Sequence, residues 1–245
     1  SEADVRNLQL YLHAGGRVLF LLDSYPDRDG RKLVVLNTFL AEWGILAGHD
    51  LVIASADYAL SVEIPGEGGT SIRTKDPTMF RPAKYENRHL ITSRFDSDKE
   101  VHFVGACSVL IDPKQATEGI KPTVLVYVDA DTFATPLFPR VRVFVPNECM
   151  DGPFGVAAAA EGKVKGNAGP ETRIVVIGDS TALCDALWGM KIARPDLVLN
   201  SIRWLAGQEY LISVDPKRPE DRSLVMADAE DSYVFRVSVF FLPLI

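Results

Sequence analysis

The sequence predicts an α/β fold in which a mainly parallel sheet is flanked by helices and carries an insertion rich in β-hairpins. Residues 173–177 form an apolar, β-branched run, which is typical of a strand buried on both faces of a parallel sheet. A second buried run, residues 17–23, begins a strand-helix-strand series that predicts a right-handed βαβ unit. Residues 63–76 are rich in glycine, proline and charge, which indicates an exposed loop or hairpin.

The chain is predicted to begin with a helix at residues 5–14, which ends at two glycines. The strand at residues 17–23 ends in an acidic residue, and a polar loop follows it. Residues 31–43 repeat apolar side chains at helical spacing, which predicts an amphipathic helix. Its apolar face consists of Leu33, Leu36, Phe39, Leu40 and Trp43. A short strand at residues 50–54 completes the βαβ unit.

The middle of the chain is predicted to hold further strands joined by irregular connections. Residues 84–93 indicate an extended or turn-rich stretch, and strands are expected at residues 101–111 and 123–128. Glycines bracket residues 154–163, which favours a strand over a helix. A short extended piece is expected at residues 210–214.

The turn after the strand at residues 173–177 has two interpretations. Asp179 and Ser180 precede a helix expected to start at about Thr181, and both are good N-cap residues. In open α/β sheets, however, ligands bind beyond the C-terminal ends of the strands. Asp23 and Ser24 follow the other buried strand, so all four residues are candidates for a ligand site at one sheet edge. A second helix follows, with its apolar face between residues 197 and 205.

Cys107 is the candidate nucleophile of this chain. It follows a predicted strand within Gly105-Ala106-Cys107-Ser108, which is similar to the turn that presents a nucleophile in hydrolases. Such a turn has a glycine two residues on either side of the nucleophile, whereas residue 109 is valine. A buried, inert cysteine is therefore the competing interpretation.

The sequence indicates no metal and no cofactor. Its four histidines, which are His13, His49, His89 and His102, lack the close spacing of metal ligands. Asp129 and Asp131 would point the same way in an extended chain and so could bind a divalent cation. A solvated loop is the alternative, because no further acidic ligand is identifiable nearby.

Composition narrows the class of partner. The net charge of −7 argues against nucleic acid as the main partner, because phosphate binding needs a basic face. The 3 cysteines are too few and too scattered for a disulfide scaffold.

The end of the chain differs from the rest. Residues 215–233 form a polar linker, and residues 234–245 are apolar except for Arg236 and Ser238. This run is shorter than the about 20 apolar residues that span a bilayer. It is either a last buried element of the domain or the start of a transmembrane helix.

Several segments together have a family signature. The first is Arg-Ile-Val-Val-Ile-Gly-Asp-Ser at residues 173–180. Further segments follow it at residues 196–207, 211–213, 216–217 and 219–222, and two precede it at residues 11–23 and 89–92. In combination they resemble the GldG-type, gliding-motility-associated auxiliary subunits of ABC transporters. The resemblance spans nearly the whole chain.

This resemblance implies a Rossmann-like fold related to class I glutamine amidotransferase-like and GIFT domains. It implies that residues 1–214 are a non-catalytic accessory domain on the periplasmic face of the cell membrane. The domain would bind a partner subunit or a translocated ligand, beside permease and ATPase subunits. Residues 234–245 would be the truncated start of a transmembrane helix. Two alternatives stay open, which are a cysteine hydrolase or amidotransferase-like enzyme using Cys107 and a carbohydrate- or nucleotide-binding module at the sheet edge.

Overall fold

The computed structural model describes most of residues 2–212. The described ranges are residues 2–24, 31–65, 71–95, 101–136, 149–165, 169–184 and 195–212. The segments expected to be a linker and the start of a transmembrane helix, residues 215–233 and 234–245, lie outside these ranges. Within them, no helix has the length and apolarity needed to cross a membrane.

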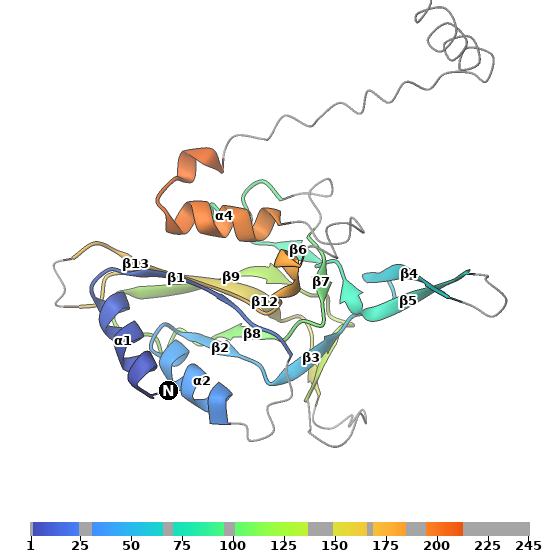
Figure 1. Cartoon of the computed structure of the whole chain (residues 1–245), viewed down its shortest axis with the longest axis horizontal. Coiled ribbons are helices and arrows are strands. Elements are labelled where there is room, and N and C mark those ends of the chain that lie inside the picture. Colours follow the sequence, from blue (N-terminus) through green and yellow to red (C-terminus); the bar gives the residue numbers. More distant parts are fainter. Residues whose placement is uncertain are drawn as a thin grey trace, which may run out of the picture. The chain divides into compact units, whose positions relative to one another are not determined.

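A five-stranded sheet forms the centre of the domain (Figure 1). Its strands, in spatial order, are β1 (Arg17–Leu21), β13 (Thr172–Ile177), β12 (Gly155–Gly162), β9 (Ile120–Tyr127) and β6 (Lys84–Tyr85). β1 and β13 run parallel in a register that pairs Arg17 with Arg173 and Leu21 with Ile177. The other three neighbouring pairs are antiparallel. The sheet is therefore mixed.

The prediction of a Rossmann-like, mainly parallel sheet flanked by helices is wrong. Only one of the strand pairs in the central sheet is parallel, and most of the described elements are strands of mixed or antiparallel sheets. The predicted βαβ unit does not form either, because β3 (Asp50–Ile53) pairs with β10 (Phe133–Pro136) in another sheet. The apolar run at residues 173–177 indicated burial on both faces, and an antiparallel strand buried in this way has the same pattern.

Three smaller sheets surround the central one. They have the strand orders β11-β10-β3, β2-β8 and β4-β5-β7. The strands not yet named are β2 (Ile45–Ala47), β4 (Ala59–Pro65), β5 (Ser71–Phe80), β7 (Phe103–Val104), β8 (Val109–Ile111) and β11 (Met150–Asp151). β4 and β5 form a hairpin that projects from the domain (Figure 1). The single strand predicted at residues 101–111 is divided into β7 and β8, which belong to different sheets.

Three α-helices lie within the described ranges, and they are α1 (Glu2–His13), α2 (Arg31–Ala41) and α4 (Asp196–Leu205). Two short 3-10 helices follow the last strand and the last helix, and they are η3 (Thr181–Leu183) and η4 (Glu209–Leu211). The helix predicted to start at about Thr181 is thus a single 3-10 turn as far as Cys184, where the described range ends. The extended piece predicted from Tyr210 is helical at its start.

Both faces of the central sheet are buried. Val175 and Ile177 pack in one hydrophobic cluster together with Trp204 of α4. Ile174 and Val176 pack in a second cluster together with residues of α1 and α2, such as Leu12 and Phe39. Because side chains alternate along a strand, one run of apolar residues serves both clusters. α4 accordingly covers one face of the sheet, while α1 and α2 lie on the other (Figure 1).

Candidate functional site

The four candidate residues of the sheet edge lie together. β1 and β13 are parallel neighbours, and the Leu22 amide continues their ladder by donating to the Ile177 carbonyl at 2.9 Å. Both strands therefore end at the same edge, where Asp23 follows β1 and Asp179 follows β13. The parallel pair alone produces this convergence, although the sheet as a whole is mixed.

Asp23 and Ser180 bind each other directly. The Ser180 amide donates to Asp23 Oδ1 at 2.9 Å, and the Ser180 hydroxyl donates to Asp23 Oδ2 at 2.6 Å. The neighbouring Ser24 hydroxyl donates to the carbonyl of Gly105 at 2.6 Å. Gly105 has a φ of 65°, which is a left-handed conformation that favours glycine. Side-chain hydrogen bonds therefore join three chain segments at this edge, which contain residues 23–24, 105 and 180.

Asp179 is the buried member of the group, with 1% of its surface exposed. Its Oδ2 accepts from the Val104 amide at 2.7 Å, and its Oδ1 accepts from the Thr181 amide at 2.7 Å and the Thr181 hydroxyl at 2.5 Å. Burial raises the pKa of this carboxyl, while these hydrogen bonds act in the opposite direction. Asp179, rather than Ser180, therefore contacts the first turn of η3, and Ser180 makes no side-chain cap bond.

Cys107 lies against the same edge but inside the protein. Its amide donates to the Gly178 carbonyl at 2.8 Å, and 1% of its surface is exposed. Burial, together with the nearby charge of Asp50, raises the pKa of the thiol to about 12. A nucleophilic cysteine needs an accessible thiolate, and this environment favours the protonated thiol.

We expect the native protein to protect Cys107 from thiol reagents. Cys184 is exposed and Cys149 is partly exposed, so these two provide internal comparisons. Labelling with N-ethylmaleimide, followed by peptide mass spectrometry, should modify Cys184 rapidly. Cys107 should react at least about 100-fold more slowly, and at the rate of Cys184 only in denaturant. Rapid native labelling of Cys107 would restore the cysteine-enzyme alternative.

The residues considered as metal ligands either make contacts within the protein or lie apart from one another. Asp129 accepts hydrogen bonds from the hydroxyls of Ser55 and Thr132, while Asp131 is exposed. His13 stacks edge-on against Trp43 with ring centroids 6.0 Å apart. Across the described ranges, no three or more histidine, cysteine or acidic side chains are grouped so that they could hold a metal ion.

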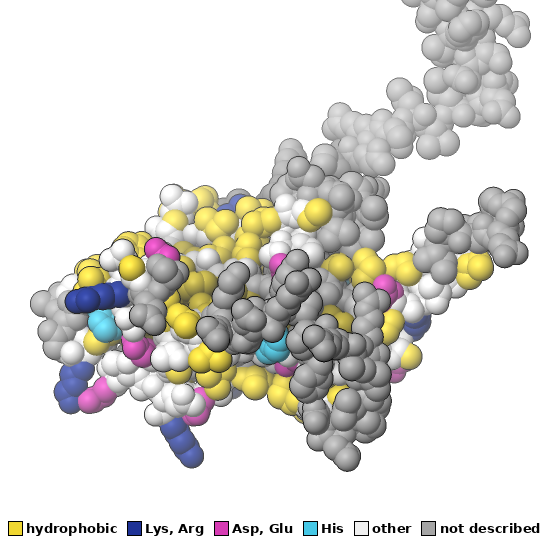
Figure 2. All heavy atoms as spheres, turned by 60° about the horizontal axis from the view of Figure 1, so that its bottom comes forward, with side chains coloured by type: hydrophobic (Ala, Val, Ile, Leu, Met, Phe, Trp, Pro, Cys, Tyr) yellow, Lys and Arg dark blue, Asp and Glu magenta, His cyan; other side chains and the backbone are white. Residues whose placement is uncertain are grey.

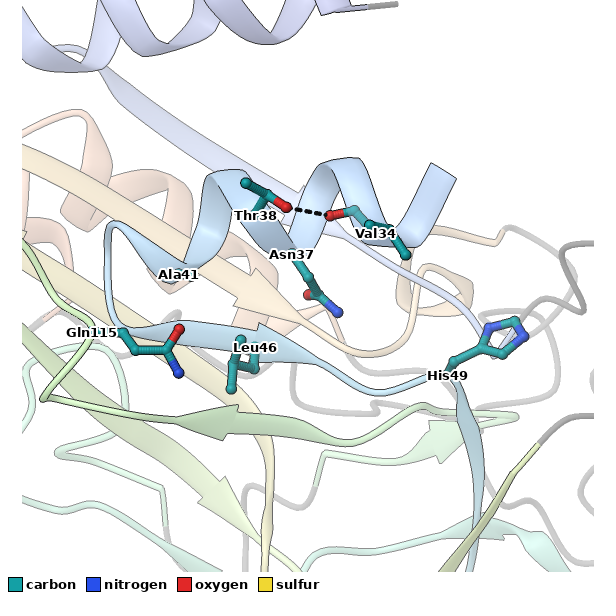
Figure 3. Close-up of a pocket in the computed structure, with 7 residues that line it drawn as sticks. All are labelled: Val34, Asn37, Thr38, Ala41, Leu46, His49 and Gln115. Atoms are coloured by element: carbon teal, nitrogen blue, oxygen red, sulfur yellow. Dashed lines mark hydrogen bonds between the residues drawn. The ribbon is translucent and has the colours of Figure 1, made fainter. Parts of the chain in front are cut away.

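A cavity of about 430 Å³ lies between α2, β2 and the loop after β8 (Figure 3). Its lining residues are Val34, Asn37, Thr38, Ala41, Leu46, His49 and Gln115. Asn37 anchors the wall, since its side-chain amide donates to the Ala47 carbonyl and accepts from the Ala47 amide, both at 2.8 Å. Sequence reasoning missed this cavity. The helical spacing of residues 34, 37, 38 and 41 places them on one face of a helix. The opposite wall includes Leu46 of β2, and the sequence did not predict that strand.

Two arginines at the opposite end of β1 and β13 were also missed. Arg17 and Arg173 are register partners, and they donate to the carbonyls of Leu205 and Trp204, respectively, both at 2.6 Å. Arg173 also lies 2.6 Å from Glu209 Oε1 and 4.6 Å from the Trp204 ring centroid. Cations favour the C-terminal end of a helix, so this pair holds the end of α4 on the sheet. The sequence contained one indication of this pair, because an arginine stands at or near the start of both β1 and β13.

Comparison with known proteins gives a family. No curated protein matches the chain. A solved structure titled "mmIFT52 N-terminal domain" matches 84% of this chain and 71% of that chain at 14% identity, with a TM-score of 0.48. That score is too low to assign a shared fold. Residues 1–201 match the family described as "ABC-type uncharacterized transport system", in agreement with the GldG-type resemblance. The match covers more than half of the chain, which therefore belongs to this family and is an auxiliary component of an ABC-type transport system.

Proposed function

We propose that this chain is a non-catalytic, extracytoplasmic accessory domain of a gliding-motility-type ABC transport system. The family match over residues 1–201 is the observation that carries the proposal, because it ties the chain to a transport system and to an auxiliary role. Permease and ATPase subunits are the proposed partners, and the periplasmic face of the cell membrane is the proposed location. The domain would bind a partner subunit or a translocated ligand.

The environment of the candidate catalytic groups supports a binding role rather than chemistry. Cys107 is buried, and its thiol pKa is raised to about 12. The carboxylate of Asp179 is used within the protein, by Val104 and Thr181. General acid-base catalysis needs groups that reach the substrate, and neither of these side chains does.

The proposed organisation follows the sequence. Residues 1–214 would form the accessory domain, residues 215–233 a polar linker and residues 234–245 the start of a transmembrane helix. The apolar character of residues 234–245 supports the membrane attachment.

Co-purification from membranes tests this proposal. We expect the full-length protein, carrying an affinity tag and extracted in mild detergent, to recover an ABC permease and an ATPase. A matched preparation of a tagged, unrelated membrane protein from the same cells controls for abundant carry-over. Recovery of the protein in the soluble fraction, without transporter subunits, would contradict the proposal.

The sheet edge supports a second candidate, which is a carbohydrate- or nucleotide-binding module. Asp23 is exposed, unlike Asp179, and Ser24 and Ser180 are partly exposed beside it. We propose Asp23, Ser24 and Ser180 as the contacts of such a ligand, and Asp179 as the buried residue that holds the turn behind them. A ligand that binds only the folded chain raises its melting temperature, and the shift grows with the logarithm of the ligand concentration above the dissociation constant. The absence of a thermal shift with millimolar sugars and nucleotides would contradict this candidate.

A further inference from the structure

The outer side of α4 and the loop beside it expose large apolar side chains. The exposed fractions are 41% for Leu199 and 47% for Ile202 on α4, 48% for Leu90 in the loop, and 67% for Tyr210 in η4. We call this surface, together with Arg88, Arg94 and Arg203, the α4 face. The inner side of α4 is fully used, because Leu197, Val198, Ser201, Trp204 and Leu205 are buried. α4 is therefore apolar on both sides, which an isolated surface helix is not.

The loop and the helix form one continuous surface. The Asn200 side-chain amide donates to the Ile91 carbonyl at 3.1 Å, and the His89 ring meets the Trp204 ring at 5.0 Å between centroids. Leu90 lies between these two anchored loop residues. Leu199 and Ile202 are three positions apart and share one side of the helix.

The described residues of the α4 face and its surroundings carry more arginines than unpaired carboxylates, although the chain has a net charge of −7. Arg88 and Arg94 are exposed, and Arg203 is partly exposed. Among the described acidic residues nearby, Glu209 is paired with Arg173, while Glu86 and Asp196 offset two of the three arginines, so one positive charge remains. The side that carries α1 and α2 instead shows charges of both signs mixed with hydrophobic side chains (Figure 2).

We propose that the α4 face rests on the anionic headgroup surface of a lipid bilayer. The arginines would meet lipid phosphates, and Leu199, Ile202, Leu90 and Tyr210 would enter the boundary between headgroups and acyl chains. The proposal builds on the membrane attachment suggested above. The described part of the domain ends at Ile212, one residue after η4, so the linker and membrane segment proposed above would begin beside the α4 face.

Vesicle flotation of the full chain tests the charge requirement. Wild-type protein should bind vesicles of phosphatidylcholine and phosphatidylglycerol more tightly than pure phosphatidylcholine vesicles, and less tightly at high salt. Each arginine near an anionic surface contributes about fivefold in affinity, so Arg88→Glu with Arg94→Glu should lower binding at least tenfold. The charge-matched control, Lys114→Glu with Lys163→Glu, changes two exposed lysines off the α4 face and should bind like wild type.

The apolar requirement is tested in the same way. Leu199→Glu with Ile202→Glu should weaken binding to the anionic vesicles by at least tenfold. Val34→Glu changes a more exposed apolar residue, at 64%, on α2 and should have no such effect. Equal binding by all variants would overturn the proposal and assign attachment to residues 234–245 alone.

Hydrogen exchange locates the contact. Anionic vesicles should slow amide exchange in residues 86–94 and 196–205 of the full chain. Protection that needs the co-purified permease, and does not occur with vesicles, would overturn the lipid assignment in favour of a protein interface. Vesicle protection without any co-purifying transporter subunit would instead contradict the proposed transport role and leave the lipid contact standing.

Discussion

Replacing Arg173 with methionine is expected to lower the free energy of unfolding by about 3 kcal/mol. The Arg173 side chain is 14% exposed, and it contacts the Trp204 carbonyl, the Glu209 carboxylate and the Trp204 ring. Methionine preserves much of the side-chain volume but leaves the Glu209 charge and the carbonyl without this partner. Urea unfolding followed by circular dichroism measures the change.

Arg73→Met provides the matched control for this substitution. Arg73 also pairs with a glutamate, Glu63 at 3.4 Å, but its side chain is 75% exposed. Exposed ion pairs contribute between about 0 and 1 kcal/mol, so this variant should unfold almost like wild type. Equal effects of the two substitutions would show that Arg173 does not hold α4 on the sheet.

Acidification is expected to destabilise the protein through His89. Burial and the neighbouring charge of Arg173 lower the pKa of His89 to about 4, while Glu86 acts in the opposite direction. As the pH falls, the unfolded chain therefore takes up a proton at His89 before the folded chain does. The stability that depends on neutral His89 is complete above about pH 6.5 and is lost as the pH falls towards 4. Between pH 7.5 and 4.5 this loss should be about 2 to 3 kcal/mol.

The His89→Gln variant isolates this contribution. Glutamine does not titrate, so its unfolding free energy should fall less between pH 7.5 and 4.5 than that of wild type, by about 2 to 3 kcal/mol. Val34→Ala changes an exposed apolar residue and should keep the wild-type pH dependence. The same pH dependence in His89→Gln and wild type would contradict this assignment.

Local structure was predicted best where a single segment contains all the information. The strand at residues 154–163 is confirmed as β12, and the amphipathic helix at residues 31–43 is confirmed over most of its length as α2. Glycines around the strand and the helical spacing of apolar residues were sufficient in these cases. The family was also predicted from the sequence, because its motifs extend over nearly the whole chain.

The candidate site was predicted in part. The sequence named Asp23, Ser24, Asp179 and Ser180, and the parallel pairing of β1 and β13 brings them together. It gave no reason to expect that Val104 and Gly105 would bind Asp179 and Ser24. Those contacts depend on where β7 and the irregular segment after it pass.

The sequence by itself determined which runs are buried, where the main helices lie and to which family the chain belongs. Only the tertiary structure decided the directions of neighbouring strands, the burial of Cys107 and the pairing of Arg17 with Arg173. Apolar periodicity reports how each segment meets the protein interior, and it is the same for parallel and antiparallel neighbours. Strand order and residue environment come from contacts between segments far apart in the chain, which no local pattern encodes.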